Sequence, residues 1–112
     1  MQQLIELEDF QKVDLRVGRI VVAEDFPKAR KPSYRLTIDF GPLGIRRSVA
    51  ALKTDYPLHS LEGRQVICVF NFGPRRIAGF DSEVLVLAAT HEDGTLRLLM
   101  PEPEAELGSY VS

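Results

Sequence analysis

The chain has 112 residues, of which 45% are hydrophobic and 27% are charged, and its formal net charge is −2. This length fits one domain, residues 1–112, and leaves little room for a second. The mild negative charge excludes a uniformly basic polyanion binder, the short apolar runs exclude a transmembrane helix, and the single cysteine excludes an internal disulfide.

Charge is distributed unevenly along the chain. Three acids lie in residues 1–10 and three more in residues 101–112, and neither segment contains Lys or Arg. Removing these six from the 16 acids leaves ten against 14 bases, so residues 11–100 carry about +4 and can hold a basic patch. The start lacks the basic segment of a secretory signal, and a free thiol suits a reducing compartment. We therefore expect a cytoplasmic protein without membrane insertion.

The first half of the chain predicts a short helix and three strands. Residues 8–13 fit the helix, because acids open it and a lysine closes it. Residues 14–26 fit a long strand whose apolar alternation changes phase at Gly18, which predicts a bulge or bend there. Residues 33–40 alternate cleanly between apolar and polar side chains, as a half-buried strand does. Residues 45–52 are predicted as the third strand.

The second half predicts further strands around a loop. Residues 54–63 mix helix and turn signals, and a glycine would end a short helix there. Residues 65–72 and 83–90 are apolar on both faces, as central strands are. The stretch between them, GPRRIAGFDS at 73–82, is predicted as an exposed loop.

The C-terminal part completes a small β-protein. Asp93-Gly94 predicts a hairpin turn into a strand at 95–100, and residues 101–112 form a tail too polar to fold alone. Five or six short strands, with a bent first strand and a short helix between the third and fourth, most resemble an OB-fold barrel. A β-sandwich is the alternative, but it usually needs more strands and a longer chain.

The residues that could carry catalysis lack partners at motif spacing. His59 and His91 lie far apart in polar turns, where histidine is ordinarily solvated. Cys68 lies inside an apolar strand and is predicted to be a core thiol. The serines lack a nucleophile-elbow context, and there is no Gly-rich phosphate loop with its lysine. We therefore expect no enzymatic activity, no metal, no cofactor and no use of ATP.

Three short basic groups lie on or beside predicted turns: residues 28–32, 46–47 and 75–76. Each alone is typical of a solvated surface, but in an OB-fold the first–second and fourth–fifth loops frame the ligand face. Nearby aromatic side chains could stack or provide apolar contact, although Phe80 could equally belong to a small satellite core under its loop. The candidate peptide- or RNA-binding residues are Lys31, Arg46, Phe72, Arg75, Arg76, Phe80 and Ser82.

Two motifs carry a family resemblance. FQKVDLRVGRI at residues 10–20 resembles the opening motif of the tRNA-binding-domain family, and NFGPRRIAGFDSE at 71–83 resembles its second motif. The family consists of OB-folds and includes free-standing tRNA-binding proteins and the C-terminal appendix of some methionyl-tRNA synthetases. The resemblance covers nearly the whole chain and implies the same fold.

One branch of the family is closer still, the small export-related chaperones that lack a synthetase domain. Similarity to this branch implies a homodimer that binds unfolded or presecretory polypeptides without ATP and is linked to the Sec export machinery. The alternative function is structure-specific tRNA binding through the same OB face. A third reading is a purely structural dimerising module.

The chain departs from the tRNA-binding pattern at positions that would approach phosphate. Lys31 and Pro32 stand where tRNA-binding members have an Asp-Lys pair, and Val49, Ala50 and Ala51 stand where they have a Val-Ser-Gly run. A lysine and a hydroxyl are lost, and a methyl is added where glycine allows close approach. These changes favour peptide over nucleic acid, because phosphate binding scales with the cations delivered.

Overall fold

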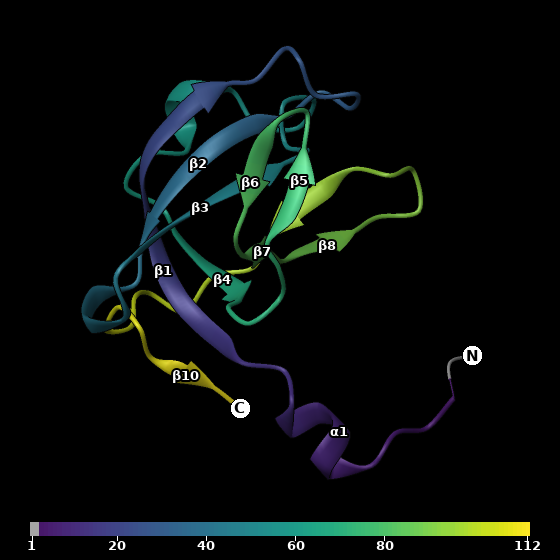
Figure 1. Ribbon diagram of the computed structural model, residues 1–112, viewed down its shortest axis with the longest axis vertical. Coiled ribbons are helices and arrows are strands. Elements are labelled where there is room, and N and C mark those ends of the chain that lie inside the picture. Colours follow the sequence, from purple (N-terminus) through teal and green to yellow (C-terminus); the bar gives the residue numbers. More distant parts are fainter. Residues whose placement is uncertain (1–2) are drawn as a thin grey trace.

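Strand β1 (Leu15–Asp25) is the longest element and belongs to both halves of the sheet. In the computed structural model, which describes residues 3–112, its first half pairs antiparallel with β4 (Gln65–Val69) and its second half with β2 (Tyr34–Asp39). The strand curves as it passes from one partner to the other (Figure 1). The first strand thus serves two parts of the barrel, as its phase change predicted.

The irregularity in β1 lies between Ile20 and Val22, and not at Gly18 as expected. The register with β2 shifts between those two residues, whereas Gly18 pairs regularly with β4. Gly18 has a different role. A Cβ atom there would lie 2.6 Å from Ile38 and 2.7 Å from the ring of Phe40, so the glycine allows close packing of the core.

The remaining elements are short. They are α1 (Leu7–Gln11), η1 (Gly41–Leu43), β3 (Ile45–Ala50), η2 (Leu58–Ser60), β5 (Arg75–Ile77), β6 (Phe80–Ser82), β7 (Leu85–Val86), β8 (Ala88–Thr90), β9 (Leu96–Leu98) and β10 (Tyr110–Val111), where η denotes a 3-10 helix. The main sheet has the order β3-β2-β1-β4-β7, with β10 also paired to β1. This nearly closed antiparallel barrel confirms the predicted OB-fold.

The core lies inside the barrel and follows the alternation read from the sequence. Along β2, Tyr34, Leu36 and Ile38 are buried and the residues between them are partly exposed. β4 carries buried side chains on both faces, Val66 and Cys68 on one and Val69 on the other. Residues 101–112 do not fold alone but pack on the barrel, where β10 pairs with the start of β1.

Three predicted elements differ from the structure. The loop predicted at 73–82 is a hairpin of β5 and β6, whose two turn residues Ala78 and Gly79 both have positive φ, 47° and 83°. This conformation matches a tight two-residue hairpin turn. Residues 83–90 form two short strands, β7 and β8, with different partners. The helix expected within 54–63 is only the 3-10 turn η2.

Side chains close the barrel between β3 and residues 82–84, at the end of β6 and just beyond it. The backbone N–H of Arg47 donates to Glu83 Oε1 at 2.8 Å, and that of Val49 donates to Ser82 Oγ at 3.0 Å. Ser48 Oγ donates to the carbonyl of Val84 at 2.8 Å. Ser82 is fully buried, so its hydroxyl completes the edge of β3 and is not available on the surface.

Asn71 connects the end of β4 to the segment before β1. Its Nδ2 donates to the carbonyl of Lys12 at 2.7 Å, and its Oδ1 accepts from the backbone N–H of Asp14 at 2.9 Å. The backbone N–H of Phe70 donates to the Asp14 carbonyl at 2.7 Å. The asparagine of the second motif therefore holds the first motif in place.

Ser82→Ala should lower the free energy of unfolding by about 1–3 kcal/mol, because it leaves a buried amide of β3 without an acceptor. Urea denaturation at fixed protein concentration measures the change, with the exposed Ser112→Ala as the control. An unchanged midpoint for Ser82→Ala would mean that this hydroxyl does not support the barrel closure.

Candidate binding site

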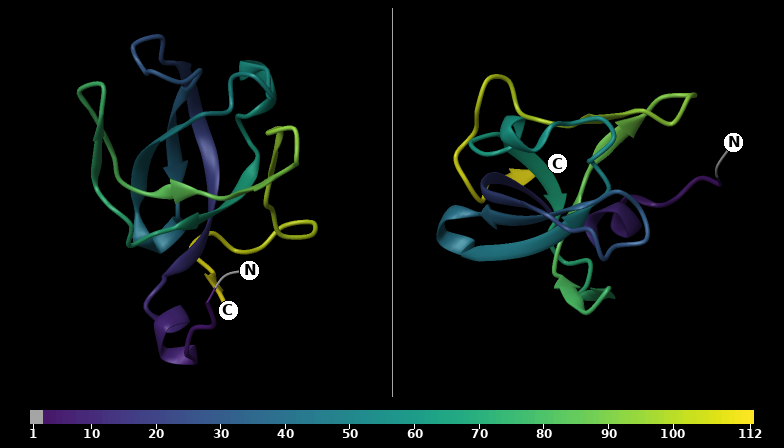
Figure 2. Two further views of the ribbon diagram at one scale, coloured as in Figure 1. Left: turned by 90° about the vertical axis from the view of Figure 1, so that its right-hand side faces the viewer. Right: turned by 90° about the horizontal axis from the view of Figure 1, so that it is seen from above.

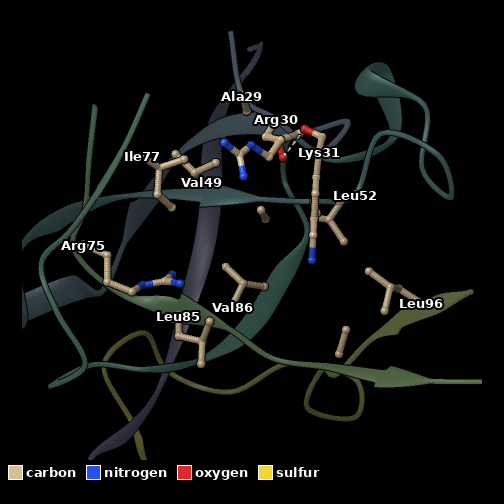
Figure 3. A pocket seen from close by; sticks show the side chains of 14 residues that line it. Ala29, Arg30, Lys31, Val49, Leu52, Arg75, Ile77, Leu85, Val86 and Leu96 are labelled. Atoms are coloured by element: carbon tan, nitrogen blue, oxygen red, sulfur yellow. Dashed lines mark hydrogen bonds between the residues drawn. The ribbon is translucent and has the colours of Figure 1, made fainter. Parts of the chain in front are cut away.

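A cavity of about 350 Å³, here called the main pocket, lies between the β1–β2 loop, the end of β3, the β5–β6 hairpin and the β7–β9 segment. Figure 3 shows side chains from all four segments turned toward it. Its walls are Ala29, Arg30, Lys31, Ser33, Val49, Ala50, Ala51, Leu52, Arg75, Ile77, Leu85, Val86, Ala88 and Leu96. The volume falls in the range of ordinary ligand sites.

Three of the lining residues are cationic, namely Arg30, Lys31 and Arg75, and none is acidic. The Lys31 side chain enters the pocket from the β1–β2 loop and the Arg75 side chain enters it from the β5–β6 hairpin (Figure 3). Two residues contact the guanidinium of Arg75. The centre of the Phe72 ring lies 5.5 Å from it, and Ser82 Oγ lies at a long distance of 3.5 Å from one of its terminal nitrogens. Its Nε is shielded from solvent and has no hydrogen-bond partner within residues 3–112.

The rest of the main pocket is apolar. Its larger side chains are Val49, Leu52, Ile77, Leu85, Val86 and Leu96. Ala50 and Ala51, two of the positions where the chain departs from the tRNA-binding pattern, also line it. Lys31, which stands at a third such position, supplies one of its cations. Three of the four departures read from the sequence therefore line one cavity, whereas Pro32 lines a neighbouring hollow.

The structure brings together four of the seven predicted site residues. Lys31 and Arg75 line the main pocket, and Phe72 and Ser82 support Arg75 from behind. Phe72 is also 47% exposed, so part of its ring remains available for contact. The basic first loop and the second motif thus meet at one site.

The other three predicted residues lie elsewhere. Arg76 is exposed and forms a 2.9 Å ion pair with Asp81 on the outer face of the hairpin. Arg46 lies 4.9 Å from the centre of the Phe70 ring. Phe80 lines a different hollow, beside the β1–β2 loop. The alternation of β5 and β6 separates Arg76 from Arg75, because adjacent strand residues point to opposite faces.

Phe80 belongs to a second cluster, the aromatic–arginine stack of Phe26, Arg35, Arg47 and Phe80. The two rings are 5.8 Å apart, and the guanidinium groups of Arg35 and Arg47 lie 5.3 and 4.8 Å from the Phe80 ring. These contacts fasten the hairpin to β2 and β3. Phe26 is buried, so the cluster fits the satellite core that the sequence left open for Phe80.

Sequence reasoning missed most of the apolar wall. Ile77, Leu85, Val86 and Leu96 line the main pocket, yet none was predicted as a site residue. The available signal was the stretch 83–90, which is apolar at both parities. Leu85 and Val86, which have opposite parity along this stretch, both line the pocket. Leu96 reaches the pocket because the β8–β9 hairpin reverses the chain and pairs Leu96 with Thr90.

The side chains considered for catalysis are not assembled into a reactive site. Burial raises the pKa of the Cys68 thiol to about 12, so it remains protonated at neutral pH. His59 and His91 are exposed. Among residues 3–112 no three His, Cys, Asp or Glu side chains gather as a metal site. The helices in that range are all too short or too polar to span a bilayer.

The arrangement of motifs and pocket can be compared with known proteins. Residues 15–110 match the family described as "Putative tRNA binding domain". The chain belongs to this family. It is 42% identical over 107 residues to a methionine–tRNA ligase of Porphyromonas gingivalis, a match that covers 96% of this chain and 15% of the ligase. The chain thus spans about a sixth of the length of such relatives.

Two solved structures match over the full chain. Chaperone CsaA from Bacillus anthracis superposes with a TM-score of 0.92 and 44% identity, covering 98% of this chain and all of that one. CsaA chaperone protein from Picrophilus torridus superposes with a TM-score of 0.90 and 43% identity, covering 97% of this chain and all of that one. These matches confirm the resemblance to the tRNA-binding-domain family and to its chaperone branch.

Cys68 should resist thiol reagents in the native protein, because alkylation requires an exposed thiolate. Ellman's reagent at pH 8 should show no reaction over minutes and one thiol per chain once urea is added. Rapid labelling of the folded protein would contradict the burial of this side chain.

Proposed function

We propose that the protein is an ATP-independent chaperone that binds extended apolar segments of unfolded polypeptides in the main pocket. The observation that carries this proposal is the convergence of Ala50, Ala51 and Lys31 on a mostly apolar cavity. At Ala50 and Ala51 the chain has methyl groups where the tRNA-binding pattern has a hydroxyl and a glycine, so a phosphate would lose a donor and close approach to the backbone. Similarity to the CsaA chaperones supports the same conclusion.

Binding would be passive and would depend on apolar burial. At about 25 cal/mol per Å², burying some 200 Å² of substrate side chain supplies about 5 kcal/mol before the ordering costs. The cations at the pocket walls would hold substrate carboxylates or carbonyls and slow dissociation. Because apolar burial is little affected by salt, binding should persist at moderate ionic strength.

The family resemblance further suggests a cytoplasmic role on presecretory chains, with the Sec export machinery as a downstream partner. This part of the proposal rests on the chaperone branch to which the two motifs point. The export role is independent of the argument from the pocket. It would be tested separately, by following the export of a secreted protein in cells that lack this chain.

A second candidate function is tRNA binding. The match to the tRNA binding domain supports it, as does the aromatic–arginine stack, where Lys28 joins Arg35 and Phe80 around a separate hollow. Arg47 is exposed beside it on the outer face of β3. Cations interleaved with aromatic rings are typical of nucleic-acid surfaces. RNA binding would therefore use a surface different from the main pocket.

We also propose a homodimer formed through the N-terminal segment. Helix α1 buries none of its residues and extends away from the barrel (Figures 1 and 2). Leu4, Ile5 and Leu7 are 93%, 67% and 70% exposed, an apolar surface that a small domain would need to cover. Near the C-terminus, Met100 and Tyr110 are also half exposed and could extend the contact.

The chaperone proposal is tested with a matched pair of variants on one hairpin. Ile77→Asn changes the pocket wall, whereas Arg76→Ala changes the outward-facing neighbour. Anisotropy of a labelled, permanently unfolded polypeptide should show about tenfold weaker binding for Ile77→Asn and little change for Arg76→Ala. Affinity should change little between about 50 and 200 mM salt, whereas a complex with six or more phosphates would weaken by orders of magnitude.

The opposite pattern would favour the RNA function. It would consist of polypeptide binding that ignores Ile77→Asn, together with a salt-sensitive tRNA complex that Arg47→Ala abolishes. Bulk tRNA can also be added to the polypeptide complex. If the two ligands bind different surfaces, tRNA should leave the polypeptide bound.

The dimer is tested by light scattering at micromolar concentration, where the mass should be twice 12.6 kDa. Leu7→Glu should shift the protein toward monomer, because it places charge in the proposed apolar contact. Val22→Glu is the control, since Val22 is also exposed, at 40%, but lies on the barrel. A mass of 12.6 kDa for the unmodified protein would refute the dimer.

A further inference from the structure

We infer that the main pocket holds the C-terminal residue of a polypeptide, with its α-carboxylate between Lys31 and Arg75 and its side chain against the apolar wall. This inference rests on the proposed peptide-binding function and names the part of the substrate that is recognised. The chemical class of the ligand is thus a chain end that carries a free carboxylate and an apolar side chain.

The charges that line the main pocket are not balanced within it. No acidic residue lines the cavity with Arg30, Lys31 and Arg75, and none of the three forms an ion pair within residues 3–112. Lys31 also borders a neighbouring hollow that Asp55 and Asp93 line. Other cations of the chain do find carboxylates, as Lys53 does with Asp25. A guanidinium keeps its proton at any physiological pH. The pocket therefore presents permanent positive charge that an incoming anion would neutralise.

Arg75 is positioned for such an anion. The central carbon of its guanidinium lies 5.5 Å from the centre of the Phe72 ring, and one terminal nitrogen lies 3.5 Å from Ser82 Oγ, while its Nε–H is buried without an acceptor among residues 3–112. The end of the guanidinium is turned into the pocket (Figure 3), so its terminal N–H groups can donate to a bound carboxylate oxygen. Lys31 enters the same pocket from a different wall, the β1–β2 loop (Figure 3). A carboxylate has two oxygens and can accept hydrogen bonds from both cations at once.

The size of the cavity favours a chain end over an internal acidic residue. The cavity is a single space of about 350 Å³ in which the cations lie among the apolar side chains. In an extended chain, residues that share a face are about 7 Å apart. An internal Asp or Glu that placed its carboxylate in the cavity would therefore hold the nearest apolar side chain on that face about 7 Å away. A C-terminal residue presents its carboxylate and its side chain from one Cα. Capture of a terminal carboxylate is also a known mode of peptide recognition.

The apolar wall argues against a phosphate as the anion. Val49, Ile77 and Val86 surround the two cations. A phosphate group offers no apolar surface to cover these side chains, so most of the wall would remain uncovered. A terminal valine, leucine or phenylalanine would fill the space and gain the free energy of apolar burial in addition to the ion pair.

The test compares two peptides that differ only at the chain end. The probes are fluorescein-labelled GSGSGSVL with a free C-terminal carboxylate and the same peptide with a C-terminal amide. The full chain should bind the free acid about tenfold or more tightly than the amide, because the amide lacks the charge-assisted hydrogen bonds. A third probe, the amide of GSGSDSVL, places a carboxylate inside the sequence and should bind no better than the plain amide.

Variants locate the effect. Arg75→Gln and Lys31→Gln should each reduce the preference for the free acid over the amide, whereas Arg76→Gln should retain it. Lys31 is exposed, so its variant keeps the test valid if Arg75→Gln does not fold. Equal binding of acid and amide, tight binding of the internal-acid probe, or no binding of either chain end would each overturn the inference.

These outcomes are distinct from failure of the proposed function. If a long unfolded polypeptide still binds in a manner that depends on Ile77 while acid and amide are equivalent, the chaperone function stands and the chain-end inference falls. If binding of the long polypeptide is independent of Ile77, the proposed function itself fails.

Discussion

The architecture depends on how the last gap in the barrel is closed. β3 is an edge strand whose amides face the segment after β6, and the side chains of Ser82 and Glu83 accept from the amides of Val49 and Arg47. A further backbone bond joins Glu83 to Arg47 at 2.8 Å. Because these contacts lie at the last residue of β6 and the residue that follows it, the rest of the hairpin projects from the barrel and holds its inner face over the main pocket. The closure therefore also shapes the site.

Much of the fold could be predicted because its signals are local. The alternation in β2 and the Asp93-Gly94 turn are properties of neighbouring residues, and both appear where the sequence placed them. The irregularity of β1 is different, since its position depends on how two partner strands share one strand. The sequence placed the irregularity at Gly18. In the structure this glycine is needed because a Cβ atom there would clash with the ring of Phe40 in the core.

The site was only partly predictable for a related reason. The sequence identified the basic loop and the second motif, and these do meet through Lys31 and Arg75. It could not separate Arg75 from Arg76, because their directions follow from a hairpin whose turn at Ala78-Gly79 has no strong sequence signal. The apolar wall comes from segments distant in the chain, and only the packing of the barrel brings Ile77 and Leu96 to the same cavity.

The hydrogen bonds of Asn71 link two regions that otherwise look independent. Asn71 binds the backbone around Lys12 and Asp14, directly after α1, and the next residue, Phe72, stacks on Arg75. Any event that orders the segment after α1 also restrains Phe72 and hence the guanidinium in the pocket. By thermodynamic linkage, a ligand that needs Arg75 in this position would in turn strengthen whatever α1 binds. Assembly and ligand affinity would then be coupled through a single asparagine.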